Sequence, residues 1–272
     1  QVKTSWSNTL ESVAEILDQN DPKEILLIGS PFASVEENYA MQQFFTLLGS
    51  EQPKFVPHII PGSGDNFLIS DDQAPNTNGV RLLDIEEDEP ENIKKALQSG
   101  FFKVVVILKD DLVGREVIEA SDLEEPYVIN MATNYSDTTR ASDLIVPVTT
   151  ASEHAASYVN VDGRIQRTLP AKETQYSNRR LNLEMSTGRL DHYGTNFDNW
   201  VNDENKIDCI PAWEFISRLA DRIGVDQRYD DGRSVMDQIS RSIGSFKQVN
   251  YERMDEEYGI QLELPDADLT KA

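Results

Sequence analysis

Apolar runs alternate with helix-like segments along the first half of the chain. Four runs have the length of buried strands, and they lie at residues 24–29, 102–108, 127–132 and 143–148. The uninterrupted VVVIL of the second run is typical of a strand buried on both faces, as in a parallel sheet covered by helices. The segments between the runs are long enough for helical crossovers. The pattern therefore predicts an α/β fold with a doubly wound, mainly parallel sheet and helices on both faces.

A helix start signal follows the first run. Ser34 and Glu37 have the spacing of a capping box, in which each side chain binds the backbone amide of the other residue. This predicts a helix from Val35 to about Leu48, ended by Gly49. The remaining predictions for this half are a short strand at 55–60, a loop of turn-forming residues at 70–79 and a helix near 91–97.

The second half begins with a hairpin signal. Two short predicted strands, 158–160 and 164–167, flank Val161, Asp162 and Gly163. Asp-Gly between two short strands indicates a tight turn, because both residues tolerate positive φ. We therefore predict a β-hairpin over residues 158–167 with Asp162 and Gly163 at its tip.

Helical periodicity returns near the C-terminus. Pro211 suits the first turn of a helix with one apolar face, and Gly224 suits its end. Another amphipathic helix is predicted from Ser234 to Ile243, and the acidic tail from Tyr251 onward is predicted to be loosely held. Between hairpin and helices, residues 172–208 are polar and are expected to form a long surface excursion. The chain is accordingly divided into an α/β domain at 1–225, a fragment of a longer subunit, and an irregular, helical and acidic C-terminal extension at 226–272.

The charge of the chain excludes some partners. It has 25 Lys and Arg against 48 Asp and Glu, a formal net charge of -23. Such a charge repels nucleic acids and anionic membrane surfaces, so we expect no nucleic-acid partner. No apolar run approaches the roughly 20 residues that a membrane span needs, so direct membrane insertion is not expected. The single cysteine excludes an internal disulfide and an iron-sulfur cluster ligated by this chain alone, and it fits a reducing compartment.

Two glycine-containing turns are candidates for phosphate binding. Gly29, Ser30 and Pro31 lead from a strand to the amides of a helix N-terminus, where an anion can bind. The chain lacks the GxGxxG and GxxxxGK[ST] patterns, so an ordinary strand-to-helix turn is the favoured interpretation. The glycine-rich residues 61–65 do not clearly link a strand to a helix and are interpreted as a connector.

The sequence favours neither a metal site nor a hydrolytic site. Its three histidines lie far apart and lack metal-ligand spacing. Glu153 and His154 could form an acid/base couple, but adjacent residues of an extended segment point in opposite directions, and no serine lies in a GxSxG elbow. Cys209 precedes the helix at Pro211 and is interpreted as an unreactive thiol. No catalytic residue and no metal ligand is therefore assigned.

One long stretch resembles a known family. The order ASDLIVP, TASEHAASYVNVDGRIQ, a polar excursion and PAWEFISRLADRIG resembles the C-terminal part of the molybdopterin oxidoreductases. Residues 34–49 and 68–80 resemble the large iron-sulfur subunit of respiratory complex I, the NADH-quinone oxidoreductase. The resemblance spans roughly residues 24–224, and its most specific part is 141–166.

The resemblance implies a domain that keeps the molybdoenzyme fold without its cofactor. Residues 155–157 are Ala-Ala-Ser where the family usually has glycine, and this chain offers no cysteine-rich region and no molybdenum ligand that aligns. The positions that mark the family, with no cofactor expected to bind them, are Glu153, Asn160, Gly163, Arg164 and Gln166.

The function implied is a non-catalytic scaffold and subunit contact in NADH-to-quinone electron transfer, with iron-sulfur clusters elsewhere in the full subunit. Its partners would be other subunits of a membrane-associated respiratory complex. The chain would be cytoplasmic and peripheral to the inner membrane. Two alternatives stay open: a fragment of a catalytic molybdopterin enzyme such as a formate dehydrogenase, in which the cofactor would be bound, and an independent nucleotide-binding module.

Overall fold

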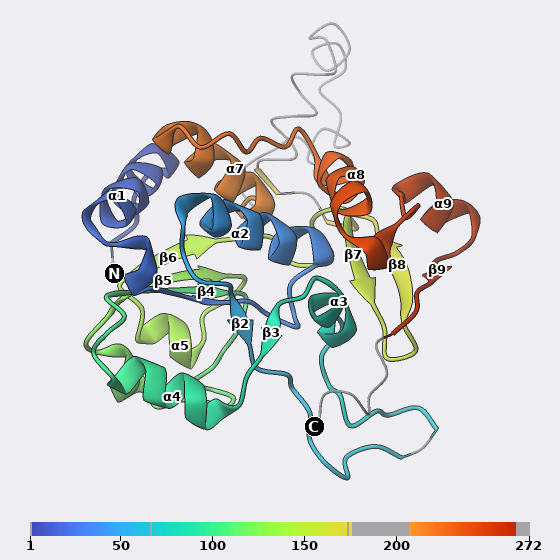
Figure 1. Cartoon of the computed structure of the whole chain (residues 1–272), viewed down its shortest axis with the longest axis horizontal. Coiled ribbons are helices and arrows are strands. Elements are labelled where there is room, and N and C mark those ends of the chain that lie inside the picture. The colour runs from blue at the N-terminus through green and yellow to red at the C-terminus, as the bar shows by residue number, and fades with distance from the viewer. Residues whose placement is uncertain (1, 66, 173, 176–206, 265–272) are drawn as a thin grey trace, which may run out of the picture.

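The computed structural model describes residues 2–65, 67–172, 174–175 and 207–264, and Figure 1 shows their arrangement. The main sheet has six strands in the order β3-β2-β1-β4-β5-β6, and all its pairings are parallel. The predicted α/β fold with a mainly parallel sheet is confirmed. The strands are β1 (Ile25–Ile28), β2 (Lys54–Phe55), β3 (Glu86–Glu87), β4 (Val104–Leu108), β5 (Tyr127–Ala132) and β6 (Leu144–Pro147).

Alternate residues of the central strands face two separate hydrophobic cores, as strand geometry requires. Leu27, Val106 and Ile129 belong to the larger core, whereas Ile28 and Ile107 belong to the smaller one. Helices cover both faces, as predicted. On the larger core lie α1 (Trp6–Gln19), α2 (Val35–Leu48) and α7 (Ala212–Ile223); α4 (Pro90–Gln98) packs on the other face, where α5 (Asp137–Arg140) also lies (Figure 1).

Helix α2 begins and ends as the sequence predicts. The Ser34 hydroxyl accepts from the Glu37 amide, the Glu37 carboxylate accepts from the Ser34 amide, and Gly49 ends the helix at φ 87°. Helix α7 likewise runs to Gly224, which has φ 76°. Both glycines adopt a left-handed conformation that other residues resist.

Some predicted elements have different limits. The strand expected at 55–60 is reduced to the two residues of β2, and α3 (Thr77–Leu82) begins inside the expected loop at 70–79. Helix α1 was not predicted, although Val13 and Leu17 are buried at helical spacing. Short 3-10 turns, η1 (Pro22–Glu24), η2 (Ala120–Leu123) and η5 (Gly244–Phe246), complete the connections.

The predicted hairpin is present, but its turn differs from the expected one. Strands β7 (Ala156–Val159) and β8 (Arg164–Thr168) pair antiparallel. Gly163 has φ 80°, whereas Asp162 is not among the described non-glycine residues with positive φ. The Gly163 amide donates to the Asn160 carbonyl, closing a turn over residues 160–163. The hairpin over residues 158–167 is therefore confirmed, and of Asp162 and Gly163 only Gly163 takes the left-handed conformation.

The C-terminal tail is held firmly up to residue 264, contrary to the prediction. After α8 (Gly232–Ser242), α9 (Tyr251–Glu256) packs against β8, and β9 (Ile260–Gln261) extends the hairpin to a three-stranded sheet. Tyr251, Met254 and Ile260 are buried in the larger core, so apolar burial outweighs the acidity of this segment. That core also contains residues on both sides of residue 225, where the sequence analysis placed the end of the α/β domain. Of the excursion predicted at 172–208, residues 176–206 lie outside the described residues.

Candidate functional site

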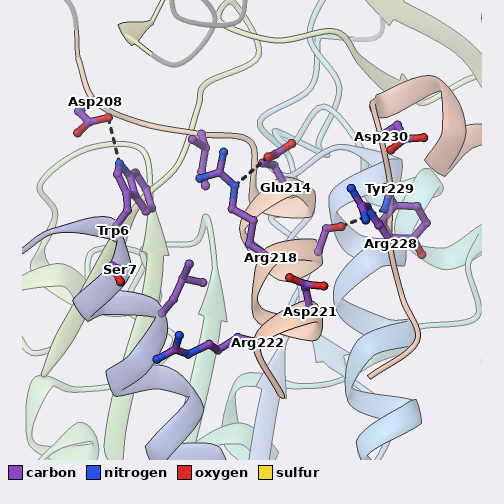
Figure 2. A pocket seen from close by; sticks show the side chains of 13 residues that line it. Trp6, Ser7, Asp208, Glu214, Arg218, Asp221, Arg222, Arg228, Tyr229 and Asp230 are labelled. Carbon is purple, nitrogen blue, oxygen red and sulfur yellow. Dashed lines mark hydrogen bonds and ion pairs between the residues drawn. The ribbon is translucent and has the colours of Figure 1, made fainter. Parts of the chain in front are cut away.

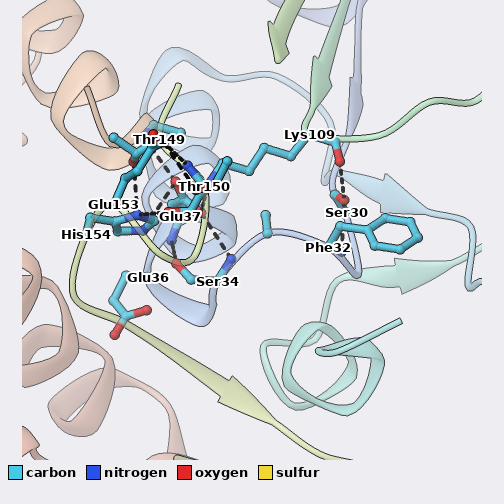
Figure 3. Close-up of polar contacts among 12 residues, drawn as sticks. Ser30, Phe32, Ser34, Glu36, Glu37, Lys109, Thr149, Thr150, Glu153 and His154 are labelled. Carbon is cyan, nitrogen blue, oxygen red and sulfur yellow. Dashed lines mark hydrogen bonds and ion pairs between the residues drawn. The ribbon is translucent and has the colours of Figure 1, made fainter. Parts of the chain in front are cut away.

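A doubly wound sheet normally binds its ligand outside the carboxyl ends of its strands, where the strand order reverses. Here β2 and β4 flank β1, so the reversal lies between β1 and β4. The residues that follow these strands are Gly29–Ser30 and Lys109–Asp110. Polar side chains gather at this edge of the sheet (Figure 3), and they form the candidate site.

The centre of the site is a buried ion pair between α2 and the end of β4. The Lys109 ammonium lies 2.6 Å from both carboxylate oxygens of Glu37. Both side chains are almost completely buried. Glu37 also accepts from the Ser34 amide at 3.1 Å and from the Ala212 amide, at the start of α7, at 3.1 Å. The helix end and the ammonium together neutralise the carboxylate.

These donors keep Glu37 ionised. Burial disfavours the charged form, but the Lys109 charge, the nearby His154 and the hydrogen bonds outweigh it and lower the pKa of Glu37 to about 2. Both carboxylate oxygens are engaged by donors of the chain itself. An ionised carboxylate that is bonded to this many donors has a structural role.

His154 lies next to this pair in a single tautomer. Its Nδ1 is 2.9 Å from the Thr150 carbonyl oxygen and 2.9 Å from the Thr149 hydroxyl. The carbonyl can only accept, so Nδ1 carries the proton and Nε2 is a bare acceptor, 3.7 Å from a Glu37 oxygen. Nε2 has no hydrogen-bond partner among the described residues. Burial lowers the pKa of His154 to about 4, although Glu37 opposes the shift.

Glu153, a family-marker position, caps the turn before His154. Its carboxylate accepts from the Thr150 amide at 2.9 Å and from the Thr150 hydroxyl at 3.1 Å, and Lys172 lies 3.4 Å away. The Cys209 sulfur is 3.9 Å from the same carboxylate. Burial and the negative charge of Glu153 raise the pKa of Cys209 to about 12. The thiol is therefore protonated at neutral pH, as expected for an unreactive cysteine.

The turn after β1 has its polar groups bonded within the chain. The Ser30 amide donates to Asn38 Oδ1 at 3.0 Å, and the Phe32 amide donates to the Ser30 hydroxyl at 3.0 Å. The Ser30 hydroxyl also donates to the Lys109 carbonyl at 3.3 Å. Together with the capped Ser34 and Glu37 amides, these bonds favour the ordinary strand-to-helix turn over a phosphate loop.

Arg115 lies on the β2 side of the point where the strand order reverses. Its guanidinium binds both oxygens of Asp110, at 2.8 and 2.6 Å, and donates to His58 Nδ1 at 3.1 Å. It also donates to the Val56 and Pro57 carbonyls. Burial raises the pKa of Asp110 to about 6, against the opposing charge of Arg115. This guanidinium bonds the segment after β4 to the segment after β2 and leaves little hydrogen-bonding capacity for a ligand.

The buried carboxylate of Glu36 ties the two sheets together. Glu36 accepts from the Ser157 amide at 2.9 Å, the Ser157 hydroxyl at 2.7 Å and the Tyr251 hydroxyl at 2.8 Å. No described cation pairs with it. Burial therefore raises its pKa despite the three donors. Glu36 links α2, the hairpin and α9.

The family-marker positions other than Glu153 all lie in the hairpin. Asn160 Oδ1 accepts from the Asp162 and Arg164 amides at 3.0 and 2.8 Å, which is an Asx turn. Arg164 donates to the Glu257 and Tyr258 carbonyls, and the Gln166 side-chain amide to the Tyr258 carbonyl, so both hold the C-terminal segment. The bonds of Arg164 thus reach a segment 93 residues away.

A cavity lies elsewhere, between α1, α7 and the segment after α7 (Figure 2). It has a volume of about 740 Å³ and is lined by both signs of charge. Trp6 donates to Asp208 at 3.0 Å, and Arg218 to Glu214 at 2.8 Å, so polar groups of the wall bind one another. Neither Glu37 nor Lys109 lines it.

The residues that sequence reasoning missed are Lys109, Asp110 and Arg115. A signal was present, because Lys109, Asp110 and Asp111 directly follow the buried run VVVIL. Polar residues that follow a buried parallel strand lie at the carboxyl edge of the sheet, where sites form. No group of three or more His, Cys, Asp and Glu residues in the described ranges could hold a metal ion.

Comparison with protein families gives a partial match. The family model described as Molybdopterin oxidoreductase matches residues 74–182, less than half of the chain. The matched region carries Lys109, Arg115 and the five marker positions, whereas β1 and α2 precede it. Comparison with curated proteins gives no match. Within the parts of the chain that the structure describes, no helix is both long and apolar enough to cross a membrane.

The described residues do not fit the cofactor that gives this family its name. Molybdopterin carries a phosphate, which needs free amides or cations. At the carboxyl edge several such donors are already bonded within the chain: the amides of Ser30, Phe32, Ser34 and Glu37, the Lys109 ammonium and the Arg115 guanidinium. The single cysteine is a buried thiol with a raised pKa, which makes it a poor metal ligand.

Proposed function

We propose that this chain is a cofactor-free, molybdopterin-oxidoreductase-like domain of the large iron-sulfur subunit of respiratory complex I. It would act as a scaffold and a contact for other subunits, on the cytoplasmic side of the inner membrane, while electrons pass through clusters elsewhere in the full subunit. The matched family model supports an oxidoreductase relationship. The complex I assignment rests on the resemblance of residues 34–49 and 68–80.

One observation carries the non-catalytic part of the proposal. At the carboxyl edge, the Glu37 carboxylate holds Lys109, the Ser34 amide and the Ala212 amide in one buried cluster. A binding site keeps such donors free for its ligand, because a ligand gains little affinity by breaking bonds that already exist. Donors bonded internally support a scaffold.

The test is elemental analysis and an absorption spectrum of the full-length subunit, purified through a tag from cells that supply molybdenum cofactor. A molybdenum enzyme from the same cells serves as the positive control for loading. We expect no stoichiometric molybdenum, tungsten or pterin, and co-purification of NADH-quinone oxidoreductase activity. A stoichiometric metal or pterin would overturn the proposal.

The family match itself favours a second candidate, a fragment of a catalytic molybdopterin enzyme such as a formate dehydrogenase. That hypothesis requires the cofactor to bind although the donors at the carboxyl edge of the sheet are already bonded within the chain. The same purification separates the two, since the catalytic hypothesis expects metal, pterin and formate oxidation in place of NADH oxidation.

A further inference from the structure

A group of exposed apolar side chains lies at the tip of one loop in the described part of the main domain. Between β2 and α3 the chain leaves the sheet, and Figure 1 shows this loop, in cyan, projecting from the lower edge of the molecule. Phe67 and Leu68 are 86% and 81% exposed, and Ile59, Ile60 and Ile69 are also exposed. We call these five residues the apolar tip. Scattered exposed apolar residues are ordinary, but five within one loop mark an interaction surface.

The backbone of the tip is held by hydrogen bonds. Asp65 Oδ1 accepts from the amides of three successive residues, Phe67, Leu68 and Ile69, at 2.9, 2.7 and 2.8 Å. The amide of Asp65 donates back to the Ile69 carbonyl at 3.0 Å. These bonds lower the pKa of Asp65, so the carboxylate stays charged and holds the turn at neutral pH.

The base of the loop is held in a similar way. Asp71 accepts from the amides of Gly62 and Gly64 at 3.2 and 2.6 Å, and the Ile60 amide donates to the Asp71 carbonyl at 2.8 Å. A side chain at Gly64 would meet the Ile69 carbonyl at 3.0 Å. The loop therefore presents its apolar side chains in a defined conformation, which lowers the entropic cost of binding.

We propose that the apolar tip docks into an apolar socket rimmed by basic side chains on another protein subunit. Three carboxylates, Asp65, Asp71 and Asp72, lie beside the tip, and no lysine or arginine occurs between residues 55 and 80. Basic groups around the socket would complement these charges and the net charge of -23. The inference rests on the proposed function, because it gives the subunit-contact role a particular surface.

The same charges argue against two other occupants. A loop that inserts into an anionic membrane usually combines apolar residues with lysine or arginine, which this loop lacks. A second copy of the chain would bring the same excess of acidic residues and would repel the tip. Both occupants are outcomes of the test.

The test places a photoactivatable phenylalanine at position 67 of the full-length subunit in its native assembly. We expect a crosslink to one apolar segment flanked by lysine or arginine on a different subunit. The matched control carries the same group at Tyr135, a similarly exposed aromatic residue on another loop, and should not crosslink to that segment. Crosslinks at position 67 only to lipid, only to a second copy, or to nothing would overturn the proposal.

Two variants measure the contribution of the tip. The double variant Phe67→Ser, Leu68→Ser should reduce the amount of the crosslinked subunit that co-purifies with this subunit by at least about tenfold. The reason is that the two most exposed side chains of the apolar tip are lost. Asp65→Ala keeps Phe67 and Leu68 but removes the hydrogen bonds that hold the turn. It should reduce co-purification of the crosslinked subunit less than the double variant does, and the crosslinked segment should stay the same. Tyr135→Ser is the control. Equal retention by all variants would contradict the proposal, provided their melting temperatures match that of the unaltered chain.

The outcome is distinguishable from failure of the proposed function. If the subunit co-purifies with NADH-quinone oxidoreductase activity but position 67 does not crosslink, the docking inference fails and the scaffold role stands. If molybdenum and formate oxidation co-purify, the scaffold role fails whatever position 67 contacts. Vesicles of phosphatidylcholine and phosphatidylglycerol, with the isolated chain, test membrane binding directly.

Discussion

Lys109 and Glu37 lie 72 residues apart in sequence, yet the lysine ammonium is 2.6 Å from both carboxylate oxygens in the buried edge of the sheet. The pair joins the end of β4 to the first turn of α2, and the Ala212 amide adds α7. Three elements of the fold are thereby bonded directly to one another. The free energy of unfolding should depend strongly on this contact.

Replacing Lys109 by Met should lower the free energy of unfolding by about 3–5 kcal/mol, because it leaves a buried carboxylate without its cation. Chemical denaturation monitored by circular dichroism measures the change. Lys94→Met, which removes a partly exposed partner of Glu119, is the matched control and should cost at most about 1 kcal/mol. Similar losses for the two variants would contradict the structural importance of the pair.

Acid should destabilise the fold partly through His154. Its pKa falls from 6.5 to about 4 on folding, so the unfolded state binds more protons between these values. Stability therefore decreases as pH falls through this window, by about 3 kcal/mol in total for this group. Asp110 opposes it, because its raised pKa of about 6 makes the folded state bind more protons below that pH.

The pH effect of His154 is isolated by comparison with His154→Asn, which keeps a donor for the Thr150 carbonyl. Glu37, Lys109 and Glu153 face the position in both proteins, so their contributions largely cancel. The difference in unfolding free energy between variant and unaltered chain should change with pH between 6.5 and about 4. A difference that is constant across this window would show that the histidine does not titrate as inferred.

The hairpin turn should depend on Gly163. Gly163→Val should cost about 1–3 kcal/mol, because a β-branched residue resists positive φ. An added Cβ would also lie 3.0 Å from the Leu262 carbonyl oxygen. Gly224→Val is the matched control, since Gly224 has a similar φ of 76° but no atom within 4 Å of an added Cβ. Gly163→Val should be the more destabilising, and an unchanged melting temperature would refute the turn.

The C-terminal segment should contribute to stability through Tyr251. Tyr251→Phe removes a hydrogen bond of 2.8 Å to the buried Glu36 and should cost about 1–3 kcal/mol, because a buried carboxyl group loses one of its donors. Tyr258→Phe, at a largely exposed tyrosine, should change stability by less than about 0.5 kcal/mol. Thermal and urea unfolding measure both. If the two variants behave alike, the Tyr251 hydroxyl does not contribute to holding the segment.

Elements whose signals are local could be predicted from the amino-acid sequence. The VVVIL run indicated β4 because five consecutive apolar residues are best satisfied by burial on both faces. Ser34, Glu37 and Gly49 set the limits of α2, since each cap is formed within one turn of the helix. Residues 163 and 224 were identifiable as left-handed positions for the same reason. The α/β class followed from the order of these elements.

Contacts between residues that lie far apart in sequence could be identified only in the folded structure. The acidic composition of the tail suggested a loose end, but β9 pairs with β8 and Tyr251 reaches Glu36, 215 residues earlier. Lys109 and Arg115 gave no local sign that they would bond to Glu37 and to the segment after β2. Whether a charge at the sheet edge stays available for a ligand depends on which side chains the fold brings within about 3 Å of it. That proximity is a property of the packed chain, because residues far apart in sequence acquire their distances only when the sheets and helices assemble.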